Sequence, residues 1–116
     1  MVAIIYKIVT TTQWKDAEAA GEFRGAPIDI SDGYIHFSTA GQVRETAAKH
    51  FAGQNDLLLV AVDADKLGDQ LRHEPSRGGA LFPHLYAVMP LDAVVRTDPL
   101  PLDSKGNHIF PAGVSA

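Results

Sequence analysis

Two pairs of side chains place a histidine and a hydroxyl group two residues apart. The first pair is His36 and Ser38, and the second is His84 and Tyr86. Residues i and i+2 of an extended strand point to the same side, so each pair predicts an imidazole and a hydroxyl on one sheet face. We expect the two strands to be neighbours and the four polar groups to converge on one candidate site.

The histidines suit ligand binding, because a neutral imidazole offers one hydrogen-bond donor and one acceptor and titrates near neutral pH. Each also needs a partner, since a buried unpaired imidazole is costly. For His36 the simpler alternative is a hydrogen bond to the backbone, with Ser38 helping to cap the next helix. For Tyr86 the alternative is a ring packed in the core with its hydroxyl at the edge.

Four further side chains extend the candidate site. Glu74 lies at the end of a short predicted strand, where it could form an exposed ion pair or orient a ribose hydroxyl or an imidazole. Arg24 and Arg77 lie in glycine-containing loops; either could clamp a pyrophosphate or a carboxylate, or be simply solvated. Tyr6 alternates with Lys7 on the first predicted strand, so one faces the core and the other faces solvent or the rim of the site.

Other reaction classes have weaker support in the sequence. No glycine-rich phosphate loop of Rossmann or Walker spacing is present, and no G-x-S-x-G segment. His36, His84 and Glu74 could form a metal site of two histidines and one carboxylate. The chain has no cysteine and no His-x-His or His-x-x-x-His spacing, so we predict no tightly bound transition metal.

Composition and charge narrow the possible partners. The 116 residues predict one domain, 1–116, with an irregular tail from about residue 99, and they carry 10 Lys plus Arg against 14 Asp plus Glu. The basic residues are scattered, so a large nucleic-acid partner is not expected, whereas a small anionic ligand is compatible. The first residues do not resemble a signal peptide, and the longest apolar run, 57–62, is too short to span a membrane. We expect a cytoplasmic protein without a membrane partner; its oligomeric state is open.

The order of the expected elements favours an α+β fold with a mixed or antiparallel sheet, because the helices come early and strands follow in succession. Thr39 and Gln42 have the spacing of a capping box at the start of the clearest helix, which Gly53 ends. The predicted helices are 11–20 and 39–52, with one turn at 63–67, and the predicted strands are 2–10, 34–38, 57–62, 71–74, 84–89 and 93–97. Segments 22–32 and 75–81 are predicted loops. The continuous apolar run 57–62 is expected to be the central strand, buried on both faces, and to pack against Val43, Ala47 and Phe51 of the second helix.

A set of residues spread over about 2–97 forms a recognisable pattern: Ile5–Ile8, Trp14, Ala17, Gly21, Asp29, Asp32–Ala40 with Gln42 and Val43, Leu71 with Glu74, and Phe82–Tyr86. In these residues the chain resembles the bacterial domain-of-unknown-function family nine-five-two. Members are sometimes labelled "glutathione S-transferase domain-containing", although nothing here resembles the thioredoxin-like half of a glutathione transferase. The segment 34–38 is also similar to the histidine-containing strand of NAD-dependent RNA 2′-phosphotransferases.

The resemblance implies an ADP-ribosyltransferase-like fold, with two main helices and a split sheet whose cleft holds NAD in relatives. We therefore expect a small nucleotide-like ligand, NAD or an ADP-ribose derivative, in a cleft lined by the two histidine motifs and Glu74. A carboxylate there would stabilise the positive charge that forms on the ribose when nicotinamide leaves, which is transferase chemistry. A ligand-sensing module without catalysis is the alternative, and a metal-dependent enzyme is a third.

Overall fold

An antiparallel four-stranded sheet forms the centre of the structure; the computed structural model describes residues 3–114, apart from the side chain of Arg77. In spatial order its strands are β4 (Ser38–Thr39), β1 (Ile4–Thr10), β5 (Leu57–Asp63) and β9 (Val94–Pro99). The long strands β1 and β5 are rich in Val, Ile and Leu, which fit a pleated, buried surface. Because β5 pairs on both sides, the predicted central strand is confirmed.

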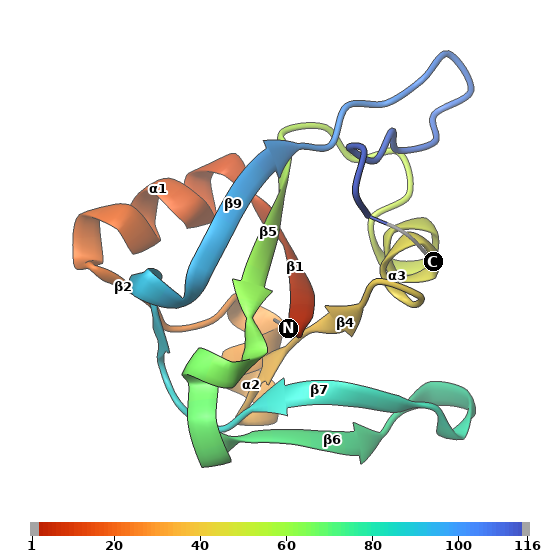
Figure 1. Cartoon of the computed structure of the whole chain (residues 1–116). Helices are drawn as coiled ribbons and strands as arrows, with labels where there is room; N and C mark the ends of the chain where they lie inside the picture. Colours follow the sequence, from red (N-terminus) through yellow and green to blue (C-terminus); the bar gives the residue numbers. More distant parts are fainter. Residues whose placement is uncertain (1–2, 115–116) are drawn as a thin grey trace.

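A smaller sheet lies beside the first (Figure 1). It carries His36 and His84. Its order is β3 (Ile35–His36), β7 (Leu81–Leu85) and β6 (Leu71–Pro75). A two-stranded ribbon pairs β2 (Glu22–Phe23) with β8 (Met89–Pro90). All of these pairings are antiparallel, so the predicted α+β class with an antiparallel, split arrangement of strands is confirmed.

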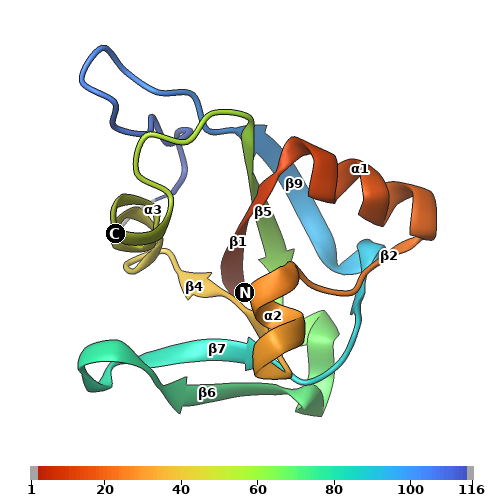
Figure 2. The same ribbon diagram turned by 180° about the vertical axis from the view of Figure 1, so that it is seen from behind.

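Helices α1 (Thr11–Ala20) and α3 (Val43–His50) lie on opposite faces of the central sheet (Figure 2). At the start of α1, the Thr10 hydroxyl accepts from Gln13 N and the Gln13 side chain accepts from Thr10 N. Short 3₁₀ segments are η1 (Ala64–Gln70), η2 (Arg77–Gly79) and η3 (Leu91–Ala93). Because α1 and α3 cover the two faces of the central sheet, β5 is buried on both sides, which explains its continuous apolar sequence.

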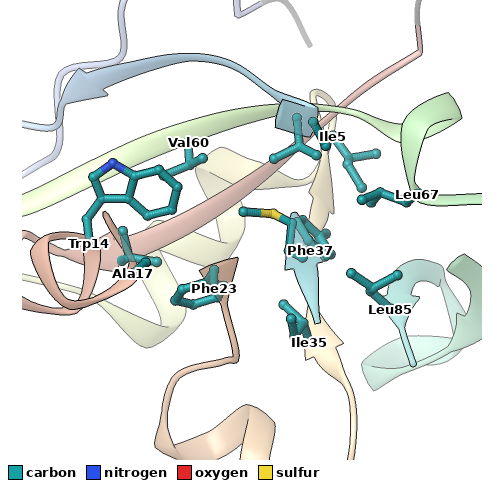
Figure 3. Close-up of a cluster of buried hydrophobic side chains, with 13 residues drawn as sticks. Ile5, Trp14, Ala17, Phe23, Ile35, Phe37, Val60, Leu67 and Leu85 are labelled. Carbon is teal, nitrogen blue, oxygen red and sulfur yellow. The ribbon is translucent and has the colours of Figure 1, made fainter. Parts of the chain in front are cut away.

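Each face of the central sheet packs into its own hydrophobic cluster. The cluster on the α1 side includes Trp14 and Phe23, together with Ile35 and Leu85 of the small sheet (Figure 3). The cluster on the α3 side joins Leu59 to Val43, Ala47 and Phe51. The prediction that the central strand packs against this face of α3 is confirmed.

The prediction of a loop at 22–32 was wrong, because this segment contains β2 and the helix α2 (Pro27–Asp32). Pro27 occupies the first helical position, where its fixed φ and missing N–H fit. The Asp29 carboxylate accepts from Ala26 N at 2.7 Å, and Gly33 ends the helix at φ 89°. These three signals mark the start and the end of a helix of six residues, which has no apolar period of its own.

The predicted strand 34–38 is broken at Phe37 into β3 and β4, which belong to different sheets. The predicted strand 84–89 ends at Leu85 in β7, and only Met89–Pro90 pairs again, with β2. Strands β6 and β7 extend into the predicted loop 75–81 as a hairpin closed by η2. Gln42 accepts from Thr39 N at 3.0 Å, yet α3 begins only at Val43.

The tail after β9 is irregular, but it is packed against the rest of the fold. Leu100 and Val114 are buried in the cluster on the α3 side, and Phe110 lies against it. Within residues 3–114, no helix is long and apolar enough to cross a membrane.

Candidate functional site

His36 and His84 face each other across neighbouring strands. They are directly paired in the register of β3 and β7, and their ring centroids are 5.5 Å apart. Ile35 and Leu85, the neighbours of the two histidines along the strands, point the opposite way and are buried in the core. The prediction that the two histidines lie on neighbouring strands and share one side is confirmed.

Glu74 joins the pair from β6. Its Oε1 lies 2.9 Å from His84 Nδ1 and accepts a hydrogen bond of 2.6 Å from the Tyr86 hydroxyl. The hydrogen bonds from Tyr86 and then from His84 lower the pKa of Glu74, and the same carboxylate raises the pKa of Tyr86. Glu74 is therefore an ionised carboxylate held in one orientation, with a third of its side chain exposed.

Tyr34 is the aromatic centre of the site, and sequence reasoning did not single it out. Its ring stacks on His84 with centroids 4.2 Å apart, and its centroid lies 4.6 Å from that of His36 and 5.2 Å from that of Tyr86. We call these residues, Tyr34, His36, Glu74, His84 and Tyr86, the histidine cluster. Four rings and one carboxylate thus gather on one face of the small sheet.

Asp29 on α2 was also missed as a site residue, although it connects the two sheets. Its side chain is 1% exposed, and each of its two carboxylate oxygens lies 2.9 Å from Nζ of Lys7 on β1. Oδ1 is 2.6 Å from His36 Nδ1 and accepts from His36 N, while Oδ2 accepts from Ala26 N. One buried carboxylate therefore holds the histidine, the start of α2 and a lysine of the central sheet.

Lys7 and Asp29 form a buried ion pair, and the attraction between their charges opposes the cost of burying them. Burial raises the pKa of Asp29, but the hydrogen bond from His36, the charge and hydrogen bond of Lys7 and the hydrogen bond from Ala26 together lower that pKa to about 2. Burial lowers the pKa of Lys7, and Asp29 opposes that shift. Two equal contacts from Nζ to the carboxylate oxygens are the geometry of an ammonium group on a carboxylate, so we treat the pair as ionised.

Comparison with known proteins places this chain in a family. The family model described as "Protein of unknown function (DUF952)" matches residues 8–97, which include the whole histidine cluster. The chain belongs to this family. No curated protein matches the chain.

Solved structures of a similar protein agree with the fold. The crystal structure of CC0527 from Caulobacter crescentus is 47% identical, with a TM-score of 0.88 over 91% of this chain and 93% of that one. The solution NMR structure of CC0527 is 48% identical, with a TM-score of 0.81 over 90% of each chain. These similarities support the arrangement of the strands that carry the histidine cluster.

The structure does not bring three of the expected site residues, Ser38, Tyr6 and Arg24, to this cluster in the way the sequence suggested. Ser38 lies beyond the strand break, and its hydroxyl is 2.8 Å from that of Thr46 on α3. Tyr6 is buried in the hydrophobic cluster on the α3 side. Arg24 forms an exposed ion pair with Glu22 at 2.7 Å. The backbone of Arg77, the fourth expected residue, lies in η2, and its side chain is outside the described part of the structure.

Two surface hollows lie away from the histidine cluster. One of about 390 Å³ is lined by α1, β2 and α2, including Phe23, Arg24 and Ile30. The other, of about 350 Å³, lies between α3 and the tail and includes Arg44 and His108. In the described part of the chain, no three His, Cys, Asp or Glu side chains are arranged to hold a metal ion; the absence of a bound transition metal stays a prediction.

The low pKa of Asp29 makes stability depend on acid pH. The folded-state value of about 2 lies below the usual 3.8, so the ionised group stabilises the fold fully above about pH 4 and loses that effect as the pH falls towards 2. We expect the difference in unfolding free energy between wild type and Asp29→Asn to shrink by roughly 2 kcal/mol between about pH 5 and pH 2 in urea titrations. A difference that stays constant over this range would show that the Asp29 carboxylate has an ordinary pKa.

Proposed function

We propose that the histidine cluster binds a small nucleotide-like ligand, with NAD or an ADP-ribose derivative as the first candidate. The observation that carries this proposal is Glu74, a partly exposed carboxylate held by Tyr86 and His84 beside aromatic rings. Both contacts end on Oε1, so we expect a ligand hydroxyl to approach Oε2. A fixed carboxylate suits the vicinal hydroxyls of ribose, and aromatic faces suit a nicotinamide or adenine ring.

Arg72 adds a positive charge at the rim of the site. It is paired with His84 in the register of β6 and β7, and its guanidinium lies 5.6 Å from the centroid of the Tyr86 ring. Its planar donors could meet a phosphate of the ligand. An anionic dinucleotide would therefore find a ribose-binding carboxylate and a phosphate-binding arginine within one small sheet.

We extend the proposal to a transfer reaction at the ribose. Nicotinamide would leave with the electron pair of its bond to C1′, and the Glu74 carboxylate would stabilise the positive charge left on the ribose. The oxygen of water or of an acceptor hydroxyl would then bond to C1′ and release its proton to an imidazole. The same site without turnover would be a ligand-sensing module, and an assay for released nicotinamide separates the two.

Glu74→Gln tests the two roles of this carboxylate. We expect less than about a tenfold loss of affinity for NAD, because the amide still offers an oxygen to a hydroxyl. Nicotinamide release should fall by about 100-fold or more, because the lost charge acts mainly in the transition state. Calorimetry and a nicotinamide assay measure the two quantities on the same samples.

The matched control is Glu45→Gln, which makes the same change on the exposed face of α3, where Glu45 pairs with Lys49. It should leave both quantities unchanged. Equal losses of affinity and turnover in Glu74→Gln would contradict a transition-state role for the charge. Affinity for NAD without nicotinamide release by the wild type would favour the sensing module.

A further inference from the structure

The two ring nitrogens of His36 contact two different carboxylates. Nδ1 lies 2.6 Å from Asp29 Oδ1, and Nε2 lies 2.9 Å from Asp32 Oδ2. A protonated ring can donate to both, but a neutral imidazole has a single N–H and can donate to one of them only. The carboxylate that keeps this proton decides which nitrogen His36 can offer to a ligand.

The surroundings of the two carboxylates are unequal. The Asp29 side chain is 1% exposed, whereas that of Asp32 is 39% exposed. A hydrogen bond to a buried charge is stronger than one in water, and losing it leaves a buried acceptor without that partner. Asp32, at the end of α2, can turn into solvent and exchange the imidazole for water at little cost.

Asp29 is also fixed in place from several sides. Lys7 holds both of its oxygens, and the N–H groups of Ala26 and His36 donate to it. Gly25 is packed so closely that a Cβ there would lie 2.9 Å from the Asp29 Cβ. The hydrogen bonds from Lys7, Ala26 and the His36 N–H therefore hold the carboxylate in place against Nδ1.

We propose that Asp29 is a positioning residue that keeps the proton of neutral His36 on Nδ1, so that Nε2 is presented to the ligand as an acceptor once Asp32 turns away. The ligand group that meets His36 is then a donor, such as a ribose hydroxyl or a carboxamide N–H, and not a phosphate or carbonyl oxygen. This inference rests on the proposed function for the position of the ligand, but the tautomer of His36 is a property of the protein alone.

The tautomer is measured by long-range ¹H–¹⁵N spectra of the ligand-free protein, at an alkaline pH where the spectra show a single N–H on the His36 ring. In wild type we expect a protonated Nδ1 and an unprotonated Nε2 on His36. Asp29→Ala should move the proton to Nε2, because Asp32 is then the remaining carboxylate. Asp32→Ala should leave it on Nδ1, and the signals of His108, which lies in the tail, should not change in either variant.

The possible results separate this inference from the proposed function. A wild-type ring protonated on Nε2, or a tautomer that does not change in Asp29→Ala, would overturn the role of Asp29. If Asp29→Ala fails to fold, the spectra of wild type and Asp32→Ala decide alone, since both should show Nδ1–H. Failure of NAD and ADP-ribose to bind would reject the proposed function and leave the tautomer result standing.

Discussion

Lys7→Met is expected to lower the free energy of unfolding by about 3–5 kcal/mol, because it leaves the Asp29 carboxylate buried without its cation. Methionine keeps the unbranched apolar stem of lysine and removes the charge, so the loss reports the ion pair more than the packing. Lys7 lies on the face of β1 that carries Ile5 and Val9, both in the core. Urea unfolding of both proteins at neutral pH measures the difference.

Lys49→Met is the matched control for this change. Lys49 is 58% exposed and pairs with Glu45 across one turn of α3, so the same substitution there should change stability little. A loss below about 1 kcal/mol in Lys7→Met would mean that Lys7 and Asp29 are not a buried, ionised pair.

Leu59→Ala should cost about 2–5 kcal/mol of unfolding free energy. Leu59 is 1% exposed at the centre of β5 and packs in the cluster that includes Val43 and Ala47 of α3. Truncation there removes buried methyl groups and leaves a cavity between the sheet and the helix. Thermal or urea unfolding measures the loss.

Val95→Ala on β9 is the comparison, because Val95 is 55% exposed on an edge strand of the same sheet. Its effect should stay within about 0.5 kcal/mol. If Leu59→Ala cost as little as Val95→Ala, β5 would not be the buried central strand.

The elements that could be predicted are those with a local signal. The apolar run 57–62 indicated a strand buried on both faces. The two-residue spacing of His84 and Tyr86 predicted that both face the same side, and both contact Glu74 although β7 ends between them. The same spacing failed for Ser38, because the strand breaks at Phe37 and the chain crosses from one sheet to the other. A break of this kind depends on which strands the segment meets, and the segment itself does not show it.

The buried half of the site could not be predicted because its contacts are distant along the chain. Lys7 and Asp29 are 22 residues apart, and neither has a neighbour in sequence that indicates the pairing. Alternation on β1 predicted that Tyr6 and Lys7 face opposite sides but not which side carries the site. The sequence does contain the boundary residues of α2, which are Pro27 and Asp29 in its first turn and Gly33 after its end. Taken as helix boundaries, they predict Asp29 at the start of a helix.

The most direct test of the central claim is an NMR titration of the ¹⁵N-labelled protein with NAD and with ADP-ribose. We predict saturable chemical-shift changes of the backbone amides around Tyr34, His36, Glu74 and His84, with little change in α3. Shifts confined to the hollow between α1 and α2 would place the ligand at a different site. No saturable shift with either ligand would contradict the account of the histidine cluster as a nucleotide-binding site.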